Sequence, residues 1–146
     1  MCTAVEPKPH VTNAVDLAGY ISWGSHSTLG RDYAIDGKIQ WGGSSSWYVV
    51  QTIESYKGVR FNNSASYPTY QASFLDWFSA AAFGGVGSSN TPVGGVSHVD
   101  EPSPSGVNDP IFYFGLWARG KSFAICAWQS RNTSFFQALG DPLVSR

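Results

Sequence analysis

The segment from residue 111 to residue 128 constrains the fold of this chain more than any other. It is apolar almost throughout, apart from a short polar break that contains Arg119 and Gly120, where a two-residue turn would join two β-strands. In the register set by that turn, one face is entirely apolar: Phe112, Phe114, Leu116, Phe123, Ile125 and Ala127. The other face mixes aromatic residues with small ones. A hairpin that is apolar on both faces belongs in the middle of a sheet covered on each side, so we predict a central hairpin here.

Shorter strands are predicted in the first half of the chain. The pair Asp36-Gly37, between two apolar runs, is the strongest short hairpin signal, and it predicts a hairpin over residues 33–41. Residues 19–23 and 47–54 are rich in β-branched and aromatic side chains and also read as strands. A helix over residues 47–56 stays open as an alternative, because apolar residues there also recur at helical spacing.

One main helix is predicted over residues 67–83. Ser66 is a plausible N-cap, Pro68 suits the first turn, and Gly84-Gly85 would end the helix. An aromatic stripe marks the face expected to pack on the sheet: Tyr70, Phe74, Trp77, Phe78 and Ala81.

Residues 84–110 are rich in glycine, proline and serine and read as a long covering loop of the kind that often lies over a binding site. A strand is possible within it, over residues 93–99. After the central hairpin, Thr133 would cap a short helix over residues 134–139 that stops at Gly140.

Together these elements predict an α+β fold, with an antiparallel sheet of about five or six strands built from hairpins and one helix on a face. The chain has 146 residues, which suits a single domain. We assign residues 1–15 to a flexible N-terminal arm and residues 16–146 to one globular domain.

Composition restricts the partners. Charged residues make up only 13% of the chain and aromatic residues 15%, which indicates a partly covered surface and a homo-oligomer. The net charge of −1 argues against a nucleic-acid partner, and the absence of an 18-residue apolar run argues against a membrane span. Residues 1–15 lack a secretory signal, so a cytoplasmic location is expected, or export if Met1-Cys2 replaces a removed signal. Cys126 reads as a buried core residue without a disulfide partner.

His98 and Asp100 are the first candidates for chemistry. On a strand these two side chains share a face, so the carboxylate could orient the imidazole as a general base. His26 is a weaker candidate and, like Arg119, a possible electrophilic helper. No second His-rich motif completes a metal shell, so no metal site is predicted, and the sequence names no cofactor.

An aromatic pocket for a small molecule is the other candidate site. Tryptophan next to glycine or serine at a strand end can line such a pocket, whereas Trp77 and Trp128 read as core residues. The predicted lining residues are Trp23, Trp41, Trp47, Tyr113, Trp117 and Arg119.

Three functions follow as hypotheses. The first is an α+β domain that binds a small ligand in the aromatic pocket. The second is a hydrolase or lyase that uses His98 and Asp100, with or without a metal. The third is an interaction protein whose aromatic residues are buried in subunit contacts.

Overall fold

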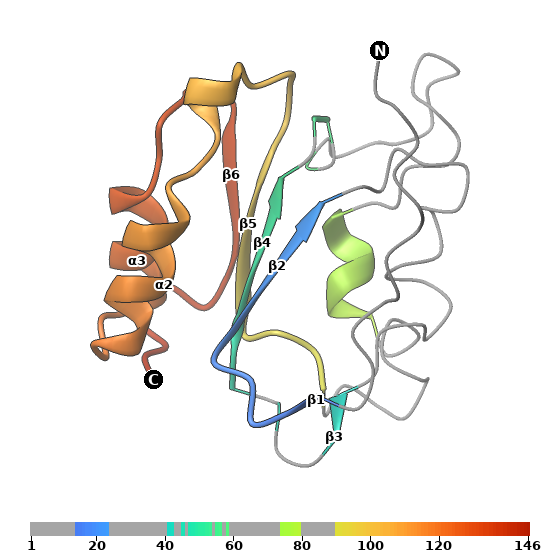
Figure 1. Cartoon of the computed structure of the whole chain (residues 1–146), viewed down its shortest axis with the longest axis vertical. Helices are drawn as coiled ribbons and strands as arrows, with labels where there is room; N and C mark the ends of the chain where they lie inside the picture. Colours follow the sequence, from blue (N-terminus) through green and yellow to red (C-terminus); the bar gives the residue numbers. More distant parts are fainter. Residues whose placement is uncertain are drawn as a thin grey trace.

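A four-stranded mixed sheet lies between helical segments in the computed structural model of this chain (Figure 1). The structure describes residues 14–23, 41–42, 45, 47–53, 55–56, 58, 74–79 and 90–146. The sheet consists of β2 (Gly19–Trp23), β4 (Val49–Ile53), β5 (Gly94–His98) and β6 (Phe136–Gly140), in that spatial order. The remaining elements are β1 (Ala14–Val15), which pairs with β3 (Trp41–Gly42), the 3-10 helices η1 (Phe74–Phe78) and η3 (Pro104–Gly106), and the α-helices α2 (Pro110–Ala118) and α3 (Phe123–Gln129).

The α+β class is confirmed, but the predicted antiparallel sheet of five or six strands is wrong in its pairing. Strands β2, β4 and β5 run parallel, and only β6 is antiparallel to its neighbour. The central strands β4 and β5 are buried almost completely. Burial on both faces is typical of parallel strands, because the segments that connect them must cross over the sheet and cover it.

The predicted hairpin over residues 111–128 is wrong, because this segment forms the helices α2 and α3. Asp109 begins α2 as its N-cap, with its Oδ1 accepting the backbone N–H of Ile111 at 2.8 Å and that of Phe112 at 3.2 Å. Pro110 occupies the first turn, where its missing N–H costs no hydrogen bond. The turn at Gly120, with φ of 72°, does exist, but it joins two helices. The apolar pattern of residues 111–128 is compatible with strands or with helices, and the N-cap at Asp109 favours the helices.

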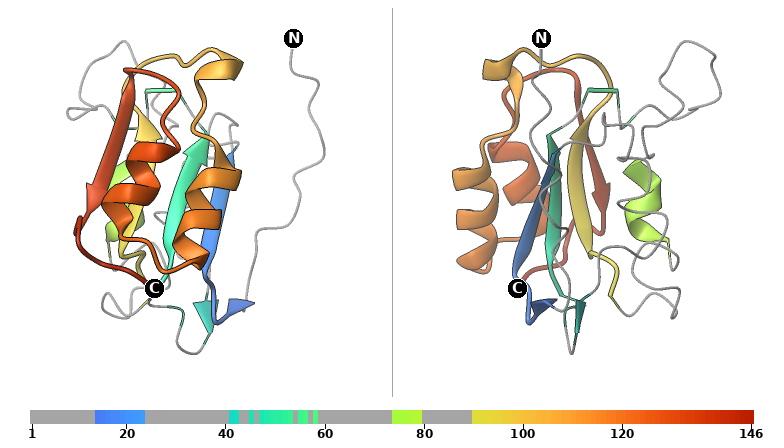
Figure 2. Two further views of the ribbon diagram at one scale, coloured as in Figure 1. Left: turned by 90° about the vertical axis from the view of Figure 1, so that its left-hand side faces the viewer. Right: turned by 45° about the vertical axis from the view of Figure 1, so that its right-hand side comes forward.

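Helices α2 and α3 cover one face of the sheet and η1 lies on the other, as the rotated views show (Figure 2). Alternation along β4 sends Val49 to the first face and Val50 to the second. The α-helical side of the core contains Val49, Val96, Tyr113, Trp117, Phe123, Cys126 and Ala127. The η1 side contains Tyr48, Val50, Phe74 and Trp77.

Two buried groups in α2 and α3 belong to the α-helical side of the core. The hydroxyl of Tyr113 donates to the carbonyl of Val50 at 3.2 Å, and burial raises the pKa of Tyr113 well above its ordinary value of 10.0. Cys126 is a buried, unbridged thiol, as predicted, and burial likewise raises its pKa. Both groups therefore stay neutral and support packing between α2, α3 and β4.

The main helix predicted over residues 67–83 lies partly outside the described residues. Within it, residues 74–78 form the 3-10 helix η1, and Phe74 and Trp77 are buried as the aromatic stripe predicted. The rings of Phe74 and Phe78 meet edge to face with centroids 5.6 Å apart. Tight packing of these rings against β5 requires Gly95, because a Cβ there would lie 2.9 Å from the Phe74 ring.

The remaining predictions divide between confirmed and wrong. The strands predicted over 19–23, 47–54 and 93–99 are confirmed as β2, β4 and β5, which excludes the alternative helix over 47–56. The helix predicted over 134–139 is wrong, because residues 136–140 form β6. Thr133 Oγ1 does accept the N–H of Phe135 at 3.2 Å, but the chain then pairs with β5 instead of coiling. The hairpin at Asp36-Gly37 and most of the N-terminal arm lie outside the described residues.

Candidate functional site

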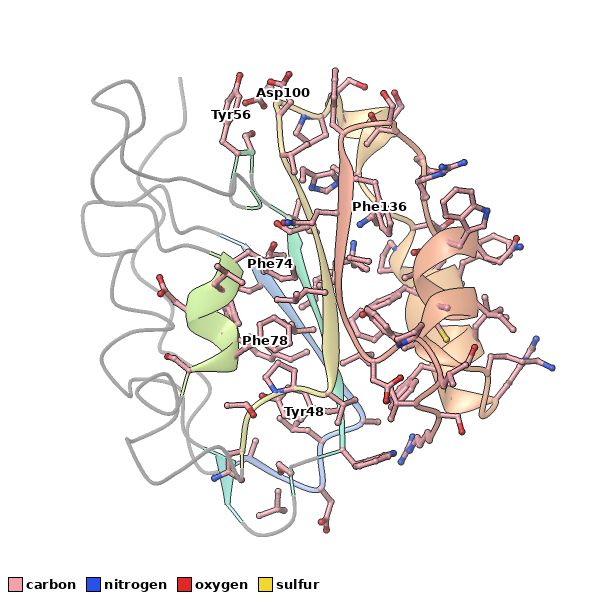
Figure 3. The ribbon with its side chains drawn as sticks, turned by 180° about the vertical axis from the view of Figure 1, so that it is seen from behind. Tyr48, Tyr56, Phe74, Phe78, Asp100 and Phe136 are labelled. Atoms are coloured by element: carbon pink, nitrogen blue, oxygen red, sulfur yellow. The ribbon has the colours of Figure 1, made fainter. Side chains whose placement is uncertain are left out.

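The carboxyl ends of β2, β4 and β5 meet at one edge of the sheet, near the start of α2 (Figure 1). In open sheets with parallel strands, ligands bind outside this edge. Figure 3 shows Tyr56 and Asp100 beside each other there. The backbone N–H of Tyr56 donates to the carbonyl of Asp100 at 3.4 Å, and that of Gly58 donates to the carbonyl of His98 at 2.8 Å. The segment after β4 is thus joined to the end of β5, and we call this region the carboxyl edge.

His98 is the last residue of β5 and is completely buried. It pairs with Phe136 of β6, and alternation along β5 puts its side chain on the same face as Val96, the face covered by α2 and α3. Gln51 of β4 lies opposite Val96 in the register and is buried on that face too. The fold therefore brings His98 and Gln51 near each other, under the helices.

Asn108, just before α2, is a third buried polar residue on this side of the sheet, and we call His98, Gln51 and Asn108 the buried polar group. The Nε2 of Gln51 donates to the backbone carbonyl of Asn108 at 2.7 Å. The side chain of Asn108 is completely buried, and neither its Oδ1 nor its Nδ2 has a hydrogen-bond partner, and nor does the Oε1 of Gln51. Unpaired buried polar atoms cost about 1–3 kcal/mol each, so proteins rarely keep them without a use.

The backbone around Asn108 is fixed from several directions. Asn132 Nδ2 donates to the carbonyl of Val107 at 2.9 Å, and the N–H of Asp109 donates to the carbonyl of Ser130 at 2.8 Å. With the bond from Gln51, three consecutive residues are held by hydrogen bonds to other elements. The carboxamide on this segment is therefore positioned by the fold, while its donor and acceptor make no hydrogen bond.

Asp100 lies two residues beyond His98, where the chain has already left the strand. Its Oδ1 accepts the backbone N–H of Glu101 at 2.8 Å, and Glu101 itself is exposed. The structure thus places the two predicted catalytic residues at the same edge, with one Asp100 oxygen engaged by the local turn. The start of α2 offers no anion site either, because Asp109 accepts its first N–H groups.

The residues predicted to line an aromatic pocket lie in different surroundings where the structure describes them. Tyr113 and Trp117 are completely buried in the core, and Trp47 is 52% exposed with its Nε1 donating to the carbonyl of Ser145 at 2.8 Å. Arg119 ends α2, about 15 Å along the helix axis from its start at the carboxyl edge. Trp23 ends β2 and Trp41 begins β3, but their side chains, like all of His26, lie outside the described residues.

His98 and Asp100 were predicted from the sequence as candidate residues, whereas Gln51 and Asn108 were not. Gln51 is a polar residue inside the apolar run of β4, and such an interruption is a signal for a buried hydrogen bond. Asn108 directly precedes Asp109-Pro110, a pair typical of a helix start, so a polar residue there is expected and gives no separate signal. Their contact spans 57 positions of the sequence, so no local pattern reveals it.

The described residues contain neither a cluster of metal-ligating side chains nor a membrane-spanning helix. No group of three or more His, Cys, Asp or Glu side chains there could hold a metal ion. In that part of the chain, no helix combines the length and apolarity that crossing a membrane requires.

Comparisons of the chain with protein-family models, with curated proteins and with solved structures found no match.

Proposed function

We propose that this chain is a hydrolase or a lyase whose reaction takes place at the carboxyl edge, with His98 as the general base. The observation that carries the proposal is the buried polar group of His98, Gln51 and Asn108 at the edge where parallel sheets bind ligands. An imidazole nitrogen would take a proton from water in a hydrolysis, or from a substrate carbon in an elimination.

Asn108 would stabilise the negative charge that develops on the substrate. Its Nδ2 is a donor held by a fixed backbone, in surroundings from which water is excluded. A fixed donor in such surroundings stabilises an oxyanion more strongly than the same donor in water does. This role replaces the one considered for Arg119, which lies at the far end of α2.

Burial of His98 sets a condition on the mechanism. Because its side chain has no exposed surface, a substrate reaches it only when covering residues move aside. Such opening is common in enzymes that exclude water from the reaction. Asp100, which follows β5 at the carboxyl edge, would then contact the substrate before His98 does.

Substitution of His98 tests the proposal. The full chain is assayed against chromogenic esters, amides, phosphate esters and β-elimination substrates, and the variant His98→Gln is compared on each substrate that is turned over. We expect kcat/KM to fall by about 10²–10⁴-fold, the usual contribution of a general base. The matched control is His10→Gln, which changes a histidine of the predicted N-terminal arm and should retain full turnover. Unchanged turnover in His98→Gln, with the fold intact by circular dichroism, would show that His98 is not the general base.

Binding without chemistry is a second candidate function, and the complete burial of His98 favours it. The same donors and acceptors would then hold a small polar molecule. Native mass spectrometry of the purified chain separates the two functions: a constant added mass, with no turnover of any substrate, would support binding alone.

A further inference from the structure

The outer surface of α2 and α3 is apolar, although a helix on the surface of a domain normally presents polar residues there. Ile111 is 82% exposed and Phe112 56% on α2, and Ile125 is 46% exposed and Trp128 59% on α3. Trp128 was predicted to be a core residue, and its exposure shows that this prediction is wrong. Gly115, Ala118 and Ala124 are exposed between these large side chains. We call this surface, made of these seven residues, the α2–α3 face.

Hydrophobicity on both sides of a helix indicates that both sides are covered. The inner sides of α2 and α3 pack on the sheet through Tyr113, Trp117 and Phe123. The outer sides expose side chains large enough to form the centre of an interface, and exposed apolar patches of this kind mark contact sites. The guanidinium of Arg131 lies 3.8 Å from the Trp128 ring centroid, so a cation already orders one of these side chains.

Charge indicates what covers the face. Asp109 lies at the start of α2 and Arg119 at its end, about 15 Å apart along the helix. If α2 packs antiparallel on α2 of a second copy, each Asp109 faces an Arg119 of the other copy, and twofold symmetry makes this contact twice. In this arrangement the dipoles of the two α2 helices also run in opposite directions, so they attract each other.

The middle of α2 allows the close approach that this arrangement needs. Gly115 lies next to the helix midpoint, and a Cβ built on it would have no atom within 4 Å. A twofold axis near this glycine lets the two α2 backbones approach closely, with Phe112 and Ile111 filling the space on either side. The small residue, the apolar side chains and the end charges all fit one antiparallel arrangement.

We infer that the α2–α3 face is the contact surface of a symmetric dimer of this chain, with α2 packed antiparallel on its counterpart. The inference does not depend on the proposed reaction, since the carboxyl edge and the α2–α3 face use different side chains.

Sedimentation velocity of the full chain over a range of concentrations tests the dimer. We expect the wild-type chain to sediment as a dimer, and Phe112→Asp and Ile125→Asp each to raise the dissociation constant by about tenfold or more. Leu143→Asp is the matched control, because Leu143 is 82% exposed but lies outside α2 and α3, and it should leave the constant unchanged.

Charge reversal tests the antiparallel arrangement. Arg119→Asp alone should weaken the dimer, and the double variant Asp109→Lys with Arg119→Asp should restore it, because the paired charges are exchanged. Circular dichroism checks that α2 survives loss of its N-cap. A wild-type monomer at high micromolar concentration would overturn the inference, as would a dimer that both apolar-to-acidic variants leave intact. A monomer that binds phosphatidylserine vesicles through Trp128 would overturn it in favour of a lipid surface.

Discussion

Trp117→Ala is expected to lower the free energy of unfolding by about 3–5 kcal/mol, the usual cost of truncating a buried tryptophan. Trp117 has no exposed surface and packs in the α-helical side of the core, between α2 and the sheet. Its removal leaves a cavity that these rigid elements cannot fill. Since a whole domain is stable by only about 5–15 kcal/mol, this variant should unfold at much lower urea concentration than the wild type.

The same variant separates a core role from a pocket role for Trp117. A residue that lines a ligand pocket can be truncated with the fold intact, as the aromatic-pocket hypothesis expects. The matched control is Trp47→Ala, because Trp47 is 52% exposed and makes one hydrogen bond through its Nε1. That variant should cost about 1 kcal/mol or less. Equal, small losses in both variants, measured by urea titration with circular dichroism, would contradict the described core.

Gly140→Ala should lower the unfolding free energy by about 3 kcal/mol, although it adds only one methyl group. Gly140 has φ of 146°, a conformation that side chains rarely adopt. A Cβ there would lie 2.6 Å from the Cα of Gly94 and 2.7 Å from the carbonyl oxygen of Val93. Both are backbone atoms of the segment leading into β5, so relief requires β6 to shift away from its neighbour.

The control for Gly140→Ala lies in the same strand. Ala138 is exposed in β6 and pairs with Val96, so Ala138→Val adds volume to the strand without an overlap. We expect it to change the unfolding free energy by less than about 0.5 kcal/mol. A loss below about 1 kcal/mol for Gly140→Ala would contradict the described pairing of β5 with β6.

The strands of this fold could be predicted where local pattern determines structure. Residues 49–53 form β4 within a segment that its β-branched and aromatic residues predicted to be a strand, and residues 94–98 form β5 where a strand was considered within a predicted loop. Their parallel pairing could not be predicted, because it depends on connections across the sheet and not on the strands themselves. Turn signals favoured hairpins, which join antiparallel strands, and this bias made the predicted sheet antiparallel.

Residues 111–128 show why a strongly apolar segment misleads. Apolar side chains on both faces of a presumed strand are also apolar side chains all round a helix, so hydrophobic period does not distinguish the two. The N-cap signal of Asp109 followed by Pro110 distinguishes them, and it lies just outside the segment. Residues 111–128 contain more apolar side chains than the core needs, because some of them, such as Ile111 and Trp128, lie on the outer surface of the helices.

The site was predictable only for residues whose chemistry is unusual by itself. His98 and Asp100 are candidates from sequence alone because they are ionisable, and the structure places both at the carboxyl edge. Gln51 and Asn108 gain their importance from a contact between β4 and the start of α2, which requires the whole fold. Buried carboxamide atoms without partners are a property of the folded chain and have no sequence signature.

The central claim is that Asn108 is held in the buried polar group for a bound molecule and not for the fold, and equilibrium unfolding of Asn108→Leu tests it most directly. Leucine has a similar volume and removes the two side-chain atoms that have no partner, while the backbone carbonyl that binds Gln51 remains. We predict that the free energy of unfolding stays equal to that of the wild type or rises by about 1 kcal/mol. A loss of about 2 kcal/mol or more would contradict the claim, because it would show that the carboxamide stabilises the fold.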